Sequence, residues 1–349
     1  MPNRNNKVIN LALQGGGSHG AFTWGVLDRL LVDGRLHINS ISGVSSGAMN
    51  AVVMAYGMLD GGPAGARELL RAFWEKVSVK FTELFYKTPG DYWEMFPGFE
   101  KPAALEAYLS LAKTFSPCQL NPFNLNPLRD LLVEHVDFER LRRKSPVKLY
   151  IGATQVRTGK LRVFTNSELS EDVLLASACL PSLHRPIDID GEYYWDGGYS
   201  GNPPLFPLIF NSKHPDIVVV LLQPLRREQV PLRREQVPYT ADEISRRRHE
   251  LSFSNTFLRE MRAIALSKEE IKLKGLFSGN LEKKIGRLKV HIIEDMEIAR
   301  MGFTSRFNAD EQFIQTLYRQ GVGAAEDWLP ENYPAITKVS TIDLAEMFC

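Results

Sequence analysis

The chain has 349 residues, of which 44% are hydrophobic and 24% charged, with 42 Lys and Arg against 41 Asp and Glu. This length and composition suffice for a large buried core and exclude wholesale disorder. The formal net charge of +1 at pH 7 argues against a dedicated nucleic-acid-binding protein, which normally carries a basic excess. The three widely spaced cysteines predict free thiols in a reducing compartment.

The sequence contains no targeting or membrane-spanning pattern. The apolar run Val8–Leu13 is too short for the core of a signal peptide and is interrupted by Asn10. No run of about 18 apolar residues occurs, so we expect no transmembrane helix. The prediction is a cytoplasmic protein that is compatible with peripheral contact with a membrane.

The first part of the chain alternates strand and helix patterns. Lys7–Leu13 and Ile38–Val44 are short apolar runs typical of buried strands, and Ala21–Val32 has apolar residues at helical spacing. Ser46–Met58 is a helix of small and apolar residues that we expect to be buried. This order indicates a parallel α/β unit.

An aromatic segment follows over Phe81–Phe99, well above the average aromatic content of the chain. One interpretation is a loop that covers the core, because aromatic side chains usually pack. The other is a lid or wall for an apolar substrate.

The α/β pattern resumes after this segment. Strands are predicted at Val147–Gln155, Leu161–Thr165, Asp216–Leu222 and Leu288–Ile293, a hairpin at Ile187–Trp195, and helices at Glu171–Ala178, Asp242–Leu276 and Ala309–Leu329. The heptapeptide PLRREQV stands twice in succession over 224–237, which favours a duplicated surface loop; attraction of its arginines to anionic lipid headgroups is the alternative. No break in composition separates two domains. We expect one domain over 1–349, with core motifs in 8–204 and a helical and strand extension over 205–349.

A G-x-S-x-G pattern, from Gly43 to Gly47, stands at a predicted strand-to-helix junction and places Ser45 at its centre. Flanking glycines allow the sharp turn that exposes a nucleophilic hydroxyl. The following helix directs its N-terminal amides toward developing negative charge.

A second glycine motif, Gly15-Gly16-Gly17-Ser18-His19-Gly20, follows the first strand. It also fits the dinucleotide-binding pattern G-x-G-x-x-G, which expects an acidic residue about 20 positions further on. The stretch 38–42 contains none. Bare glycine amides between a strand and a helix suit an oxyanion as well as a phosphate, so the neighbouring serine turn favours an oxyanion site.

With Asp196-Gly197-Gly198 downstream, the three motifs stand in an order that resembles the patatin-like phospholipase family, and 176–181 is similar to the small-residue stretch that precedes the family aspartate. The resemblance covers about Val8–Pro204. It implies a three-layer α/β/α fold with a largely parallel sheet and a lipid acyl hydrolase of the phospholipase A or lysophospholipase type, acting on lipid or phospholipid without a cofactor. It also implies Ser45 as nucleophile, Asp196 as its partner in a Ser–Asp dyad, Gly15, Gly16 and Gly17 as oxyanion donors, and Gly43, Gly47, Gly197 and Gly198 as motif glycines.

One position departs from the family pattern: His19 stands where the family usually has Arg or Lys. We expect His19 to position the loop; as a cation it would act only when protonated. The dyad itself requires a buried Asp196, because an aspartate of ordinary pKa is a weak base for an alcohol. The apolar Tyr193–Trp195 beside it fits that requirement.

Three alternatives remain open at this stage. In the first alternative, the substrate is another acyl ester, such as a neutral lipid or a storage polyester. In the second alternative, the base is a histidine. The candidates are His214, His249 and His291, which follow Asp196 in the chain order of a Ser–acid–His triad. In the third alternative, the protein binds lipid but is catalytically silent. No metal-ligand spacing is present, and the sequence leaves the oligomeric state undetermined.

Overall fold

A computed structural model describes residues 6–86, 103–223, 237–274, 279–301 and 303–349. Its centre is an eight-stranded sheet in the order β5-β6-β3-β2-β1-β7-β8, with β4 paired to β3. The parallel strands are β1 (Lys7–Leu13), β2 (Leu36–Gly43), β3 (Lys148–Gln155), β7 (Asp216–Val220) and β8 (Lys289–Ile293). The antiparallel strands at one edge are β4 (Leu161–Thr165), β5 (Ile187–Ile189) and β6 (Glu192–Asp196).

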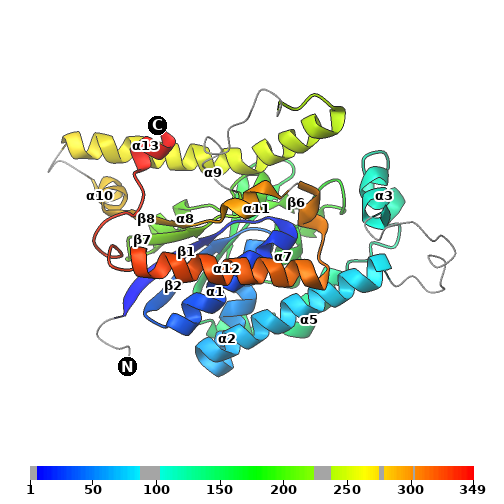
Figure 1. The fold of residues 1–349 in the computed structure, drawn as a ribbon, viewed down its shortest axis with the longest axis horizontal. Coiled ribbons are helices and arrows are strands. Elements are labelled where there is room, and N and C mark those ends of the chain that lie inside the picture. Colours follow the sequence, from blue (N-terminus) through cyan, green and yellow to red (C-terminus); the bar gives the residue numbers. More distant parts are fainter. Residues whose placement is uncertain (1–5, 87–102, 224–236, 275–278, 302) are drawn as a thin grey trace.

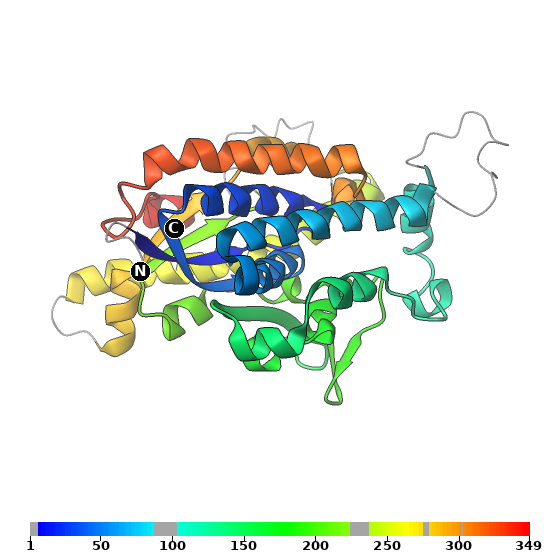
Figure 2. The same cartoon turned by 90° about the horizontal axis from the view of Figure 1, so that it is seen from below.

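Helices cover both faces of this sheet, which gives the predicted three-layer α/β/α architecture (Figures 1 and 2). One face carries α1 (Gly20–Asp33), α2 (Ser46–Tyr86), α5 (Pro127–His135), α6 (Phe138–Lys144), α7 (Glu171–Ser177) and α12 (Glu311–Asn332). The other carries α8 (Phe206–Asn211), α9 (Ala241–Lys274), α10 (Asn280–Arg287) and α13 (Leu344–Phe348). Three further helices are α3 (Ala103–Leu111), α4 (Pro117–Leu120) and α11 (Met296–Arg300).

The region beyond residue 205 is built into the same sheet. β7 pairs with β1, and β8 pairs with β7, both in parallel. α12 packs closely on α1, where a Cβ on Gly25 would lie 2.1 Å from the Tyr318 carbonyl oxygen and one on Gly321 would lie 2.0 Å from the Phe22 carbonyl oxygen. Glycine on both helices therefore lets the two backbones approach at a distance that no side chain permits.

Most predicted elements, including the helix over Ser46–Met58, lie within a few residues of the observed bounds, but a second helical segment follows this helix within α2. The first segment of α2 is interrupted at Gly62, whose φ of +56° and ψ of −142° are not helical, and the second segment runs from Pro63 to Tyr86. Proline is tolerated at the start of the second segment, because its missing N–H has no helical partner there.

The aromatic segment predicted as a loop begins inside α2. Phe81 is only 9% exposed and belongs to the core with Leu70, Phe73 and Trp74. These residues stand at positions i, i+3, i+4 and i+11, which lie on one face of a helix, and this is the helical signal that the aromatic density obscured. Residues 87–102 lie outside the described structure, as does most of the duplicated heptapeptide. The lid interpretation and the interpretation of the repeat therefore stay predictions.

Candidate active site

Ser45 occupies the sharp turn between β2 and α2, at the carboxyl end of the parallel strands. Its φ of +52° lies in the left-handed region, which a non-glycine residue adopts only where the surroundings enforce it. A Cβ on Gly47 would lie 2.3 Å from the Leu13 carbonyl oxygen, and one on Gly43 would lie 2.8 Å from the backbone of Gly47. The turn therefore requires glycine on both sides of the serine.

The backbone of Ser45 is anchored from α7. Its N–H donates to the carbonyl oxygen of Ser177 at 3.1 Å and to the Oγ of Ser177 at 2.9 Å. The Ser177 hydroxyl in turn donates to the Gly152 carbonyl oxygen on β3 at 2.7 Å. Ser177 is completely buried, so this chain of bonds ties the serine turn to β3, the strand that pairs with β6.

Asp196 ends β6 and begins the following helical turn. Its Oδ1 accepts the Gly198 N–H at 2.7 Å, and its own N–H donates to the Cys179 carbonyl oxygen at 2.8 Å. The side chain is 1% exposed. Burial raises the pKa of Asp196 to about 7, although the bonds from the Gly198 N–H and the Ser45 hydroxyl oppose this shift. The carboxyl thus has the basicity that a dyad needs near neutral pH.

The Ser45 hydroxyl and the Asp196 carboxyl are neighbours. The hydroxyl is close enough to lower the Asp196 pKa as a hydrogen-bond donor. Asp196 Oδ2 is nevertheless buried without a hydrogen bond of standard geometry to any described residue. The two groups are adjacent, and the bond between them is not fully formed in this state. Catalytic hydrogen bonds are often long without substrate and tighten when it binds.

The predicted oxyanion loop uses two of its three glycine amides internally. The Gly15 N–H donates to Asn202 Oδ1 at 2.7 Å, and the Gly16 N–H donates to Ser46 Oγ at 3.1 Å. The N–H groups of Gly17 and Ser46 donate to no group among the described residues. Gly17 and Ser46, the residue after the candidate nucleophile, are therefore the amides available to an oxyanion.

Asn202 clamps this loop and was not recognised in the sequence. It is completely buried. Besides accepting from the Gly15 N–H, it donates through Nδ2 to the Gly15 carbonyl oxygen at 3.3 Å, and its own carbonyl oxygen accepts from Gln14 Nε2 at 3.3 Å. The Gln14 Oε1 accepts from the N–H groups of Leu222 and Gln223 at 2.6 and 2.8 Å. The loop is thus fastened to the segments that follow both Asp196 and β7.

His19 lies against the C-terminal region rather than facing Asp196. Its Nε2 is 2.8 Å from Ser305 Oγ, and the ring is 1% exposed. Burial, assisted by the nearby Arg306 guanidinium, lowers the pKa of His19 to about 3. The imidazole is therefore neutral at pH 7 and supplies no cation. The loop-positioning role predicted for it agrees with this placement.

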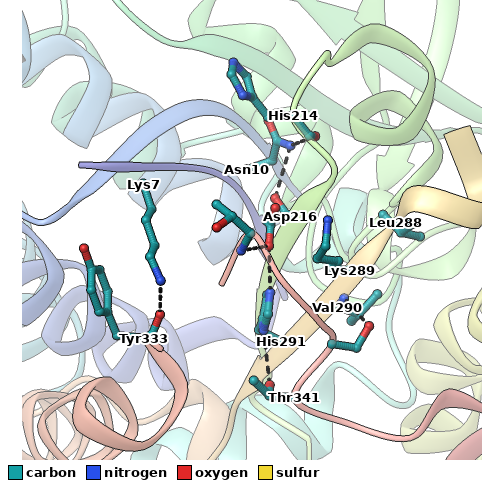
Figure 3. Close-up of polar contacts among 12 residues, drawn as sticks. Lys7, Asn10, His214, Asp216, Leu288, Lys289, Val290, His291, Tyr333 and Thr341 are labelled. Carbon is teal, nitrogen blue, oxygen red and sulfur yellow. Dashed lines mark hydrogen bonds and ion pairs between the residues drawn. The ribbon is translucent and has the colours of Figure 1, made fainter. Parts of the chain in front are cut away.

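His291 is buried in a separate network (Figure 3). Its Nε2 lies 3.2 Å from Asp216 Oδ1, and its Nδ1 lies 3.2 Å from Thr341 Oγ1. Asp216 also accepts the Thr337 N–H at 2.7 Å. Asp216 is the first residue of β7, whereas the serine turn follows the last residue of β2. Both ring nitrogens are engaged, so this network fastens the C-terminal segment to the sheet and offers Ser45 no base.

Two other candidate bases, His214 and His249, follow Asp196 in the sequence. His214 precedes β7, at the same end as Asp216, and its carbonyl oxygen accepts from Asn10 Nδ2 at 2.8 Å (Figure 3). His249 lies on α9, one turn before Phe253, whose ring packs on Gly198. His249 is thus the histidine on the element that covers the aspartate turn.

We expect His249→Ala to retain at least about a tenth of the wild-type ester turnover, because the buried Asp196 carboxyl already lies beside the serine as a candidate base. The measurement is kcat for a p-nitrophenyl acyl ester, with His214→Ala as the matched control. A loss of more than about 100-fold at His249 alone, the size expected for removal of a general base, would replace the dyad by a triad.

The described residues contain no cluster of three or more His, Cys, Asp or Glu side chains that could hold a metal ion. Cys118, Cys179 and Cys349 are free cysteines. Burial beside Asp196 raises the pKa of the Cys179 thiol to about 12, so this thiol is protonated and no competing nucleophile. None of the described helices combines the length and apolar character that crossing a membrane requires.

A serine on a strand-to-helix turn at the carboxyl end of a parallel sheet defines the α/β class of acyl hydrolase sites. The sequence profile described as patatin-like phospholipase matches residues 11–209, more than half of the chain. The chain therefore belongs to the patatin-like phospholipase family, and it is a lipid acyl hydrolase in the general sense of that family.

Two solved structures illustrate the range of similar chains. VipD from Legionella pneumophila is 13% identical, with a TM-score of 0.40, over 93% of this chain and 67% of VipD. A chain of the heterodimeric ExoU–SpcU complex, from the type III secretion system of Pseudomonas aeruginosa, is 15% identical, with a TM-score of 0.27, over 96% of this chain and 78% of that one. A comparison with curated protein sequences found no significant match.

Proposed function

We propose that this protein is a serine-dependent lipid acyl hydrolase of the phospholipase A or lysophospholipase type, with Ser45 as nucleophile and Asp196 as its base. The observation that carries the proposal is the meeting of a serine held at positive φ with a buried carboxyl from a distant strand. We further propose that 1–349 forms one hydrolase domain. The parallel pairing of β7 and β8 with the rest of the sheet supports this.

In the acylation step, Asp196 accepts the proton of the Ser45 hydroxyl while Oγ forms a bond to the ester carbonyl carbon. The carbonyl electrons move onto oxygen, where the Gly17 and Ser46 N–H groups donate to the oxyanion. The tetrahedral intermediate then collapses and the bond to the lysolipid or alcohol oxygen breaks. Asp196 returns its proton to this leaving oxygen.

Deacylation repeats the same proton path with water. Asp196 takes a proton from a water molecule whose oxygen attacks the acyl carbon. The bond to Ser45 Oγ breaks, Oγ recovers the proton from Asp196, and a fatty acid is released. No step requires a metal ion or a cofactor, because the buried carboxyl and the free amides supply the base and the oxyanion site.

The experiment is covalent labelling with a fluorophosphonate, followed by mapping of the modified peptide. We expect the label on Ser45 and none in Ser45→Ala, with the exposed Ser167 replaced by alanine as a control that keeps the label. A panel of phospholipids, lysophospholipids, triacylglycerols and polyesters then identifies the substrate. If Ser45→Ala hydrolyses the best substrate as fast as the wild type, the dyad is wrong. If no acyl ester in the panel is hydrolysed, the protein is a silent lipid-binding protein.

A further inference from the structure

Helix α9 lies directly over the aspartate turn. A Cβ on Gly198 would lie 2.3 Å from the Phe253 ring, and the rings of Phe253 and Tyr199 are 4.8 Å apart at their centroids. Further along, the Glu260 carboxylate accepts the N–H groups of Leu205 and Phe206. The inner face of α9 is therefore fixed to the segment that carries Asp196. Figure 1 shows this long helix at the edge of the molecule, on the opposite side of the sheet from α2.

The outward face of α9 carries aliphatic side chains in a row. Ile244, Leu251, Leu258 and Leu266 are 44%, 43%, 37% and 53% exposed. The first three are spaced by seven residues, which places them on one side of a helix, and Leu266 follows after a further eight. Four large aliphatic side chains in one row exceed the scattered apolar residues of an ordinary surface.

Between residues 244 and 266 the charged side chains on this face are positive, whereas the exposed Glu243, Glu269 and Glu270 lie beyond its two ends, with Glu269 paired to Lys272. Arg248, Arg259 and Arg262 are exposed, and helical spacing places them among the aliphatic row. None of the three forms an ion pair with a described residue, whereas Arg247, on the flank, pairs with Glu250. Among the exposed residues from 244 to 266 whose side chains the structure describes, there is no Asp or Glu.

We propose that the outward face of α9 docks on the surface of an anionic phospholipid bilayer. In the membrane interface, aliphatic side chains of a helix enter the region of the acyl chains, and arginine guanidiniums bind lipid phosphates. This proposal rests on the proposed function, because a lipid hydrolase needs a bilayer near its nucleophile. The Phe253 contact puts the aspartate turn about one helix diameter, roughly 10 Å, below that surface.

Charge decides between a bilayer and a second copy of the chain. Two copies joined through this face would bring their unpaired arginines together, and like charges at an interface oppose association. Anionic headgroups satisfy the arginines and leave the aliphatic row in an apolar layer. An acidic protein would satisfy the charges, but it would need a matching apolar groove as well.

The test is partitioning onto sedimented vesicles, with Ser45→Ala as the parent so that the lipid is not hydrolysed. The vesicles contain phosphatidylcholine alone or with about one third phosphatidylglycerol. Each basic residue near an anionic surface contributes roughly a factor of five. We therefore expect the triple variant Arg248→Ala, Arg259→Ala and Arg262→Ala to bind the anionic vesicles on the order of 100-fold more weakly.

The matched control removes the same charge from the other side of the sheet, with Arg71, Arg143 and Arg319 replaced by alanine. It is expected to lose less than about fivefold. Leu251→Ser with Leu258→Ser is expected to weaken binding to the anionic vesicles, as the arginine variant does. Thermal melting of each variant establishes that it is folded. If the triple alanine variant does not fold, the same three arginines are replaced by glutamine and the measurement is repeated.

Equal binding by the arginine variant and its control would overturn the docking surface, as would absence of binding by the parent. Dimerisation that the leucine variant abolishes, without vesicle binding, would assign the face to a second copy instead. Hydrolysis of a soluble short-chain ester by the wild type keeps the two proposals apart. Ester turnover without vesicle binding contradicts docking alone, and vesicle binding without ester turnover contradicts the catalytic proposal alone.

Discussion

Asp196→Asn is expected to lower kcat for ester hydrolysis by about 10³-fold or more. The amide keeps the shape of the carboxyl and its bond from the Gly198 N–H, but it cannot accept the Ser45 proton. General-base catalysis typically contributes about 10²- to 10⁴-fold, and both ring nitrogens of the buried His291 are engaged elsewhere. The measurement is kcat and KM with a p-nitrophenyl acyl ester, and KM is expected to change little. A variant that keeps a tenth of the wild-type kcat would remove Asp196 from the mechanism.

The pH profile tests the same residue in the wild type. Asp196 acts as a base only when it is charged, and burial raises its pKa to about 7. Activity is therefore expected to be full above this pKa and to fall as the pH drops through about 7. An ordinary aspartate would lose activity only near pH 4. An acidic limb centred near pH 4 would show that the carboxyl is solvated during turnover.

The free energy of unfolding is expected to change with pH in the opposite direction to the activity. Because the folded-state pKa of Asp196 is raised from 3.8 to about 7, the folded protein binds a proton more tightly than the unfolded chain. Its stability therefore falls as the pH rises through this window. At about 1.4 kcal/mol per pKa unit, the penalty at pH 8 is at most about 4 kcal/mol. Asp196→Asn is then expected to be more stable than the wild type at pH 8 and equal to it at pH 4, as measured by urea unfolding.

The sequence predicts the parallel part of the fold well, because its strands are buried on both faces. Continuous apolar runs such as Lys7–Leu13 and Asp216–Val220 have few alternatives to a central strand. The sequence does not predict the elements that depend on tertiary packing. The second helical segment of α2, which begins after the non-helical Gly62, is held by Leu70 and Phe73 packed in the core. The short helix α13 is also not predicted, because the sequence analysis places the last helix at Ala309–Leu329.

The same distinction applies to the candidate site. The residues named from the sequence, Ser45 and Asp196, stand in motifs whose glycines are needed locally, and the structure brings their side chains together. Ser177 and Asn202 act through hydrogen bonds to backbone groups far away in the chain. Such a bond depends on the assembled fold and leaves no periodicity or spacing in the sequence. The only local sign of the Asn202 clamp in the sequence is the pair Asn202-Pro203 shortly after the Asp-Gly-Gly motif.

Asn202→Ala is expected to lower kcat by about 10²- to 10³-fold with a smaller change in KM. Removing the side chain frees Gly15 from both of its bonds, so the loop that presents Gly17 loses its fixed position. Loss of one oxyanion donor has an effect of this size, because the donor acts on the transition state more than on the bound ester. The buried Gly15 N–H is also left without a partner, which costs about 1–3 kcal/mol of stability.

A second asparagine separates loss of stability from loss of catalysis. Asn166 bridges two backbone groups in the same way, since its Oδ1 accepts the Leu149 N–H at 2.8 Å and its Nδ2 donates to the Val147 carbonyl oxygen at 3.0 Å. Asn166→Ala is expected to lose comparable stability and to keep kcat within a factor of about three. Asn202→Asp retains an acceptor for the Gly15 N–H, so part of the kcat should return. Equal kcat values for the two alanine variants would mean that Asn202 supports the fold and not the oxyanion loop.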